Sequence, residues 1–554
     1  MCPSYSRTSY KLGVPVDMLL THFPIFLKMA VWSQLALATS SAPIALVALL
    51  IIIGAYVRYV KSAKYRYPPG PVALPLLGNV HQLPMEYQQR RLAEWGGIYG
   101  DIVFARFFRT PVVVLNSKEA AVELLEKRSG KYSDRPPFVL LKELMGWDSV
   151  LNNLPYGERF RKQRKWLHDA FLSKDALVNY RPIQRRETYT LLSELCDKPE
   201  LFMDHIVRWA AAMVLDIAYG YRVTGLGDEL VETAERTTVE TVIAGSPGSM
   251  LVDFFPILKG IPLWMPGSGF KRQALYVRSL VRRTLDTPYE MVKRDLMAGT
   301  AAPSLTVTLL EEALAEGKLT ADYEEDIKGA AGVIYAAGSD TTVTTMKTFV
   351  LAMVLHPNVY QRARAELDRV IGPERLPDFE DRESLPYLEC VVREVFRWNP
   401  PVPLGVPHRL SCDDVYRGYD IPDGSMVIPN IWWMTHNPDV YPNPERFDPD
   451  RYMQMSAEDT ARVDPRDVVF GFGRRICPGQ AFADASVWLA AASIIATMDL
   501  SFAKDDFGRD IIPDAAFVSG FVSHPKEFKC AFRPRSDRTQ SLIAHTNAIN
   551  IVAS

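Results

Sequence analysis

A single cysteine-containing segment constrains this chain more than any other feature of its sequence. Residues 470–479 read Phe-Gly-Phe-Gly-Arg-Arg-Ile-Cys-Pro-Gly and precede an apolar, alanine-rich run that predicts a helix from about Gln480. A thiol just before a helix N-terminus meets unsatisfied backbone N–H groups and the positive end of the helix dipole. Both favour the thiolate, which is the form that binds a soft metal. We therefore expect Cys477 to ligate a metal ion.

The neighbours of Cys477 suit a flat, negatively charged ligand. Gly473 and Gly479 let the backbone pass close to such a ligand. Phe470 can cover the sulfur, and Arg475 can reach an anionic group. The spacing F-x-x-G-x-R-x-C-x-G is present in full, which favours a metal-bound cofactor over a cysteine that only packs in the core.

A second segment whose side chains could take part in catalysis lies within a long helical pattern over residues 331–355. It reads Ala-Gly-Ser-Asp-Thr-Thr from Ala337, and Ala337 and Thr341 share one helix face because they are four residues apart. Small residues on that face let a ligand come close. The Thr341 hydroxyl and the neighbouring Asp340 carboxylate can hold water and relay protons. Asp340 and Thr341 are therefore predicted catalytic residues.

These two segments resemble those of the cytochrome P450 family. The resemblance implies a mainly α fold with small β-sheets and a haem b whose iron is ligated by Cys477. It also implies that Arg475 contacts a haem propionate. By the same match, Asp340 and Thr341 form the acid–alcohol pair that supports activation of O2.

An E-x-x-R pattern is similar to a structural network of the same family. Glu394 and Arg397 are three residues apart on a predicted helix, and such a pair alone is a common surface ion pair. A later Pro-Glu-Arg-Phe stretch contains Arg446. The resemblance implies that Glu394, Arg397 and Arg446 form a buried network that supports the fold.

Two further segments extend the expected haem contacts. Residues 156–164 resemble the helix that packs beside the haem, and Arg164 is retained at the position of a propionate contact. Phe160 stands where the family usually has tryptophan, so one propionate hydrogen bond is expected to be missing. His408 and Arg409 lie where the family often has a propionate-binding arginine, which makes Arg409 a predicted haem contact.

Residues 385–388, 396–400 and 414–419 resemble fungal enzymes of the O-methylsterigmatocystin oxidoreductase type. The resemblance implies a monooxygenase that uses O2 and NADPH-derived electrons from NADPH–cytochrome P450 reductase. Its substrate would be a hydrophobic small molecule of secondary metabolism, such as a terpenoid, polyketide or indole. Two alternatives stay open, namely a P450-fold isomerase or dehydratase that needs no reductase, and a non-catalytic haem-binding protein.

The expected substrate pocket is mainly aliphatic and aromatic. Its predicted walls are residues 138–154, 334–342, 402–406 and 517–521. These segments suit a hydrophobic ligand and offer no obvious charged anchor. For Val402 and Phe517, ordinary core packing is an equally consistent interpretation.

Residues 31–57 contain no charged side chain. As a helix they would be about 40 Å long at ~1.5 Å per residue, which exceeds a ~30 Å hydrocarbon core. They therefore predict one transmembrane anchor, with a buried core helix or a cleaved signal peptide as the alternatives. Four basic residues follow the segment within ten positions, against three scattered before it, which places the C-terminal part in the cytosol. The expected location is the endoplasmic reticulum membrane, crossed once.

The rest of the sequence predicts one large domain. Residues 1–30 are an N-terminal extension (a lumenal tail or a gene-model artefact), 58–71 a basic, proline-rich linker, 72–535 the catalytic domain and 536–554 a tail. Hydrophobic residues make up 48% of the chain, enough for a large core. With 63 basic and 65 acidic residues the net charge is −2, so nucleic acid is not an expected partner. Six dispersed cysteines without C-x-x-C spacing argue against disulfides or structural zinc.

Overall fold

The computed structural model describes Leu49, residues 65–245 and residues 250–553. The predicted N-terminal extension and most of the predicted anchor and linker lie outside these residues. From Tyr67 onward the chain forms one compact unit. Its start falls five residues before the predicted domain boundary at residue 72.

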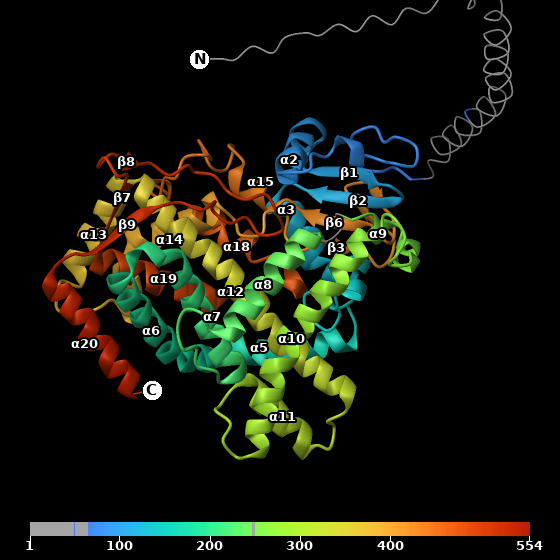
Figure 1. Ribbon diagram of the computed structural model, residues 1–554. Coiled ribbons are helices and arrows are strands. Elements are labelled where there is room, and N and C mark those ends of the chain that lie inside the picture. Colours follow the sequence, from blue (N-terminus) through green and yellow to red (C-terminus); the bar gives the residue numbers. More distant parts are fainter. Residues whose placement is uncertain (1–48, 50–64, 246–249, 554) are drawn as a thin grey trace, which may run out of the picture. The chain divides into compact units, whose positions relative to one another are not determined.

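Helices make up most of this unit, as the sequence predicts (Figure 1). The helical patterns predicted over residues 331–355 and from about Gln480 correspond to helices α12 and α19. The α-helices are α2 (Gln88–Tyr99), α3 (Lys118–Ala121), α4 (Ser129–Tyr132), α5 (Glu158–Phe171), α6 (Lys174–Asp197), α7 (Phe202–Tyr219), α8 (Glu229–Ala244), α9 (Leu251–Phe254), α10 (Gly269–Met297), α11 (Leu305–Ala315), α12 (Ala321–Leu355), α13 (Pro357–Val370), α14 (Pro386–Trp398), α15 (Ile431–His436), α16 (Asp450–Met453), α17 (Ala457–Arg462), α18 (Arg466–Val469), α19 (Gln480–Thr497) and α20 (Asp537–Ala553). Shorter helical turns are η2 (Val80–Gln82), η3 (Val122–Lys127), η4 (Leu140–Leu144), η5 (Pro199–Leu201), η6 (Pro256–Gly260), η7 (Phe379–Ser384) and η8 (Gly473–Arg475).

Three small sheets complete the fold. The largest has the strand order β1-β2-β6-β3, in which β2 and β6 are parallel and the other pairs are antiparallel. The strands are β1 (Ile102–Phe107), β2 (Thr110–Leu115), β3 (His408–Arg409), β4 (Asp414–Tyr416), β5 (Tyr419–Ile421), β6 (Met426–Pro429), β7 (Met498–Lys504), β8 (Asp510–Ile511) and β9 (Cys530–Pro534). Residues 111–115, a proline followed by β-branched residues and a leucine, form most of β2.

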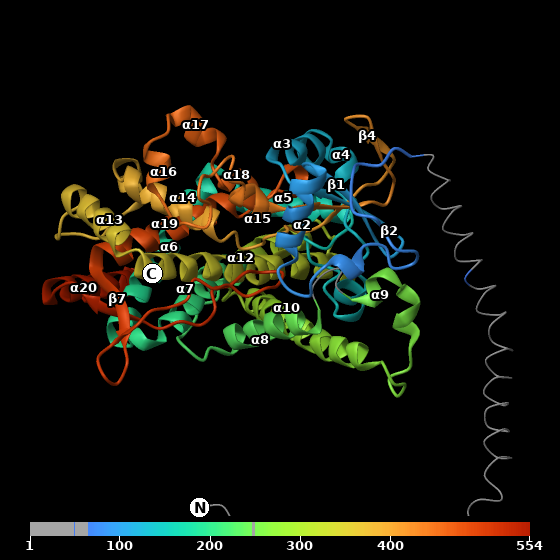
Figure 2. The same ribbon diagram turned by 90° about the horizontal axis from the view of Figure 1, so that it is seen from above.

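The longest helix, α12, runs through the middle of this unit (Figure 2). The side chain of Thr320 caps its N-terminus by accepting a hydrogen bond from the Tyr323 N–H. Helices α7 and α10 pack along one side of α12, and α14 and α19 pack along another. Most of its residues are buried on every face, as expected of a helix in the centre of a large core.

The end of the proline-rich linker is part of the folded unit. The Pro69 carbonyl accepts a hydrogen bond from the Phe104 N–H on β1 (2.9 Å). A Cβ at Gly70 would collide with the Phe104 carbonyl, so only glycine fits this close approach. The ring of Tyr67 stacks on that of Phe104, with centroids 4.3 Å apart. The linker is therefore fixed along the edge of the main sheet.

The buried Glu-Arg-Arg network is present, but the prediction of Arg446 as its third member is wrong. Glu394 and Arg397 are fully buried and joined by two hydrogen bonds of 2.8 Å. The second guanidinium comes from Arg451, whose Nε lies 3.2 Å from Glu394 Oε1. Arg446 is 69% exposed and contributes only its backbone carbonyl, which accepts from Arg397. The Pro449-Asp-Arg-Tyr452 stretch, a second Pro-x-Arg-aromatic pattern, is the signal that could have identified Arg451.

The segment predicted as a C-terminal tail contains helix α20, which packs against α6. Ile543 on α20 is buried, and the Thr190 hydroxyl on α6 donates to Asn547 Oδ1 (3.3 Å). Among the described residues, α19 is the one helix long and apolar enough to cross a membrane, and 67% of it is buried inside the protein. Its position marks α19 as a core helix.

Candidate active site

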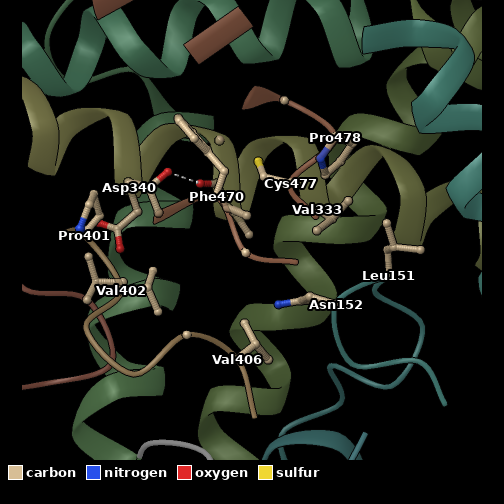
Figure 3. Close-up of a pocket in the computed structure, with 18 of the residues that line it drawn as sticks. Leu151, Asn152, Val333, Asp340, Pro401, Val402, Val406, Phe470, Cys477 and Pro478 are labelled. Carbon is tan, nitrogen blue, oxygen red and sulfur yellow. Dashed lines mark hydrogen bonds between the residues drawn. The ribbon is translucent and has the colours of Figure 1, made fainter. Parts of the chain in front are cut away.

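A cavity of about 400 Å³ lies between α12 and the loop before α19. Figure 3 shows the sulfur of Cys477 and the side chains of Val333, Asn152 and Val406 around this space. Its walls are mostly apolar, and they come from α5, α7, α8, α12, α19 and the loops that follow α14 and η4. Sequence segments more than 300 residues apart therefore meet at one enclosed site.

Cys477 lies where the sequence places it, directly before α19, with part of its surface open to the cavity. Its backbone N–H donates to the Phe470 carbonyl (2.8 Å), which fixes the loop. Burial raises the pKa of the Cys477 thiol, while the Gly479 N–H and the charge of Arg164 oppose that rise. Desolvation therefore opposes the thiolate that the groups at the helix end favour. A bound metal ion would deprotonate the thiol outright.

Three guanidinium groups reach this cavity without an ion-pair partner among the described residues. Each donates to backbone carbonyl oxygens. The pairs are Arg164 with Ile476 (2.6 Å), Arg475 with Ser133 (2.8 Å), Leu151 (3.3 Å) and Leu154 (2.8 Å), and Arg135 with Asn152 (3.0 Å), Val406 (2.6 Å) and Pro407 (2.8 Å). Three cations with no paired carboxylate create a positive potential that favours a bound anion.

Burial also lowers the pKa values of these arginines. Burial lowers the pKa of Arg164, and burial together with the neighbouring charge of Arg475 lowers that of Arg135. Burial lowers the pKa of Arg475 to about 10. Its guanidinium stacks on the Phe160 ring at 3.8 Å, a cation–π contact. Phe160 therefore supports Arg475 by stacking, although it cannot donate a hydrogen bond as tryptophan would.

Helix α12 brings Asp340 and Thr341 to the cavity. The Thr341 hydroxyl donates to the Ala337 carbonyl one turn earlier (2.9 Å), which leaves its oxygen free to accept from another donor. Ala337 is exposed to the cavity in a helix that is otherwise mainly buried. The structure thus places a hydroxyl and a carboxylate beside a small residue, and all three share the cavity with Cys477.

Comparison with known proteins agrees with this geometry. Residues 68–532 match the model of the family described as cytochrome P450. The chain belongs to the cytochrome P450 family. It is 47% identical over 502 residues to cytochrome P450 monooxygenase 176 of Postia placenta, an overlap that covers 89% of this chain and 96% of that protein. It is 41% identical over 495 residues to cytochrome P450 monooxygenase claR of Ampulloclitocybe clavipes, with 89% and 90% covered. The predictions of a P450 and of a monooxygenase enzyme are confirmed.

The residues of this P450 fit the haem that the family implies. A planar macrocycle with two carboxylates needs an iron ligand, apolar walls and cationic partners at one edge. The cavity supplies a thiol at Cys477, and the three unpaired guanidinium groups of Arg135, Arg164 and Arg475 suit the carboxylates. This donor set is hard to explain without an anionic ligand, because uncompensated buried cations are costly.

One predicted haem contact does not reach the cavity of the P450. Arg409 is 42% exposed, lies 3.4 Å from Asp134 and is absent from the cavity lining. Its neighbour His408 points inward instead, is 4% exposed and lines the cavity. Sequence reasoning missed Arg135, whose position before two prolines and an apolar run (residues 136–141) is its only local signal.

The glycines of the cysteine motif have different roles. Gly479 lines the cavity, as predicted. Gly473 does not line it. Its φ is +57°, and a Cβ there would collide with the Leu125 carbonyl on η3. The close approach that Gly473 permits is therefore to the protein backbone rather than to a flat ligand.

The predicted pocket walls are found in part. Trp147, Val150, Ile334 and Val402 line the cavity of the P450, together with Phe521. Phe517 does not, because its ring packs against Trp398 with centroids 5.4 Å apart. Helix α8 was not among the predicted walls. It contributes Thr238, Thr241 and Val242 to the cavity.

Proposed function

We propose that this P450 is a membrane-anchored haem-thiolate monooxygenase that oxidises a hydrophobic small molecule of secondary metabolism with electrons from NADPH–cytochrome P450 reductase. The observation that carries the proposal is the shared cavity. Cys477 and the Asp340–Thr341 pair both line it, so a metal ligand and a proton-handling pair meet in one enclosed space.

The side chains have separate tasks in this proposal. A bound haem supplies the oxygen chemistry, and the cysteine ligand favours O–O cleavage. Cys477 holds the iron, while Arg135, Arg164 and Arg475 bind the two carboxylates. Phe470 lines the cavity beside the sulfur, where it restricts access of water. Reduction of O2 to one inserted oxygen atom and one water consumes two protons, which Asp340 and Thr341 are positioned to deliver.

The cavity lining supports a hydrophobic substrate. Away from the arginines it is formed largely by aliphatic and aromatic side chains, among them Leu141, Trp147, Val402 and Phe521. The hydroxyls of Thr238 and Thr241 add polar groups on α8. Such a lining suits a largely apolar molecule oriented by few hydrogen bonds. The likeness to O-methylsterigmatocystin oxidoreductase-type enzymes supports a terpenoid, polyketide or indole.

An exposed apolar segment supports membrane association in addition to the predicted anchor. Ile257 is 84% exposed and Trp264 80% exposed, and Leu251, Leu263 and Met265 are exposed nearby. This segment begins with α9, which lies beside the β1–β2 end of the main sheet in Figure 1. Apolar side chains gathered in this way favour the surface of a bilayer. We place the enzyme at the cytosolic face of the endoplasmic reticulum.

Reconstitution tests the proposal directly. The full-length protein is combined in phospholipid vesicles with NADPH–cytochrome P450 reductase, NADPH and ¹⁸O₂, and offered a panel of terpenoids, polyketides and indoles. We expect a product that carries one ¹⁸O atom and forms only with both NADPH and reductase. Conversion of a panel compound without NADPH would instead support a P450-fold isomerase or dehydratase.

A further inference from the structure

Asp340 has a partner on the side of the site away from the cavity. His524 Nε2 lies 3.2 Å from Asp340 Oδ1, and His524 Nδ1 lies 2.8 Å from the Thr344 hydroxyl oxygen. Asp340 lines the cavity, whereas His524 does not, and 30% of the His524 side chain is exposed. The imidazole ring therefore contacts the carboxylate from a position that is accessible to solvent.

Buried hydrogen bonds hold the His524 backbone close to α12. The Val518 N–H donates to the His524 carbonyl (2.7 Å), which closes a tight hairpin. The amide of Asn399 donates both to the Ser523 carbonyl (2.7 Å) and to the Thr348 hydroxyl on α12 (3.0 Å). The location of the ring is thus set by the fold and not by its own contact with Asp340.

The protonation of the ring decides how well these contacts are made. The Thr344 hydroxyl donates to the Asp340 carbonyl (2.9 Å), and its oxygen lies 2.8 Å from His524 Nδ1. The imidazolium form can donate from Nδ1 to this hydroxyl and from Nε2 toward the Asp340 carboxylate, and its positive charge strengthens the second contact. A neutral ring with its hydrogen on Nε2 keeps both contacts only if the Thr344 hydroxyl turns to donate to Nδ1, and its contact with the carboxylate then lacks the charge.

We propose that protonated His524 is a positioning residue for Asp340, holding the carboxylate in the orientation that serves the cavity. The inference rests on the proposed function, because the orientation of Asp340 matters only if the cavity consumes protons. Without the positive charge on the ring, Asp340 is held less firmly. Product formed per NADPH consumed then falls, and the remaining electrons leave as hydrogen peroxide.

Other charged groups surround this pair. Lys347 on α12 interacts electrostatically with Glu235 on α8, Asp204 on α7, Glu527 after the hairpin and Asp340. Glu235 also interacts with Asp204 and Asp340. All four remain in place when only residue 524 is replaced. A pH dependence that persists unchanged in such variants would belong to these groups.

Thermal unfolding of the haem-loaded, full-length protein tests the contact without any turnover. The proteins compared are the wild type, His524→Gln, Asp340→Asn and the double variant, at about pH 6 and about pH 8, on either side of the usual histidine range. We expect the combined loss in Tm at pH 6 to be smaller than the sum of the single losses, because each variant already breaks the same contact. The gap between the sum of the single losses in Tm and the loss in the double variant should be smaller at pH 8. Additive losses at both pH values would overturn the proposal.

Product formed per NADPH consumed, measured across the same pH range, tests the consequence. In the wild type this ratio should fall as pH rises. His524→Gln should give a ratio roughly tenfold lower at pH 6 and independent of pH, a smaller loss than the ~10²–10⁴ typical of a group that transfers the proton itself. His524→Lys keeps a positive charge throughout this range. Its product formed per NADPH consumed should therefore be higher than that of His524→Gln and should not change with pH.

A control variant tests whether the pH dependence belongs to His524 or to any histidine of the protein. His168→Gln removes an exposed histidine that lies 3.4 Å from Asp169, and it should keep the wild-type profile. A wild-type pH profile in His524→Gln, or in His524→Lys if the first variant does not fold, would overturn the proposal. If the wild type itself forms no product with NADPH and reductase, the proposed function fails, while the Tm comparison still decides whether His524 holds Asp340.

Discussion

Burial determines how individual side chains of the cavity behave. Burial raises the pKa of the Cys477 thiol, and a bound metal ion would favour the thiolate. Among the described residues, Arg135 (buried) and Arg164 and Arg475 (partly buried) are cations that donate to backbone carbonyl oxygens and have no ion-pair partner. Each is costly alone and becomes favourable when an anion binds. The cavity is therefore preorganised for a dianionic ligand.

Replacing Arg135 tests this view. Arg135→Leu removes one cation and leaves the Val406 and Pro407 carbonyls without their donor. We expect haem affinity to fall roughly 10–100-fold, the range seen when groups that support a metal site are removed. The measurement is the rate of haem transfer from the protein to excess apomyoglobin.

Arg409→Leu is the matched control, because Arg409 is an arginine that the sequence also assigned to the haem. Its side chain is outside the cavity and pairs with Asp134 at the surface, so its haem transfer should match the wild type. Equal haem loss in Arg135→Leu and the wild type would contradict the assignment of Arg135.

Thr341→Ala tests the proton-handling pair. The variant should bind haem and still consume NADPH with the reductase, because the hydroxyl is not needed for folding. Its product per NADPH should fall and hydrogen peroxide should rise, with ~10²–10⁴ as the upper range of loss for a proton-transfer group. The control is Thr308→Ala, which removes a hydroxyl with the same kind of back-bond, to the Ser304 carbonyl (3.1 Å), at a position outside the cavity. Equal coupling in Thr341→Ala and the wild type would remove Thr341 from the mechanism.

Helix α14 is held to the segment around α16 by ions buried in the protein interior. Glu394 accepts from Arg397 and Arg451, and it also accepts the Asp448 N–H (2.8 Å). Arg397 in turn donates to the Thr435 and Pro444 carbonyls. Removing one ion leaves another buried without its partner. We therefore expect these elements to lose their packing together.

The two candidate arginines of this network give a direct comparison. Arg451 is 6% exposed and contacts Glu394, whereas Arg446 is 69% exposed. Arg451→Ala should lower the free energy of unfolding by ~3–5 kcal/mol and reduce haem incorporation. Arg446→Ala should change it by no more than ~1 kcal/mol. Chemical denaturation of both variants measures the difference, and equal stabilities would contradict the role given to Arg451.

The sequence predicts the residues of the cavity that lie in short motifs. It does not predict residues whose contact with the cavity depends on the direction of the side chain in the fold. Cys477, Arg475 and the α12 pair were predicted from local motifs and Arg164 from the family resemblance, and all of them line the cavity. Arg409 was not placed correctly, because neighbouring residues on a strand point to opposite faces and only the fold turns His408 inward. Arg446 and Arg451 occupy similar Pro-x-Arg-aromatic patterns five residues apart, and the tertiary path of the loop chooses between them. Such choices depend on partners far away in the chain.

Two surface features bear on how the folded unit meets a membrane. Its first residues lie along β1, where the proline-rich linker is fixed. A separate group of exposed apolar side chains follows α9. The second feature does not depend on the predicted anchor, so the folded unit should keep some affinity for lipid without residues 1–57.

Deleting residues 1–57 allows this affinity to be measured. The truncated protein should still bind phospholipid vesicles, and Ile257→Glu with Trp264→Glu should weaken binding by at least about tenfold, or ~1.4 kcal/mol. Phe507→Glu, at the exposed β7–β8 turn, should leave binding unchanged. Co-sedimentation with vesicles gives the affinities. Unchanged binding in the double variant would place the membrane contact elsewhere.

The central claim is that Cys477 ligates the iron of a bound haem. The most direct measurement is the difference spectrum of the reduced protein with and without CO, for the wild type, Cys477→Ser and Cys412→Ser. Cys412 is an exposed cysteine outside the cavity. The wild type and Cys412→Ser should show the band characteristic of thiolate-ligated haem, and Cys477→Ser should lack it. A Cys477→Ser protein that keeps the full thiolate-type band would contradict the account.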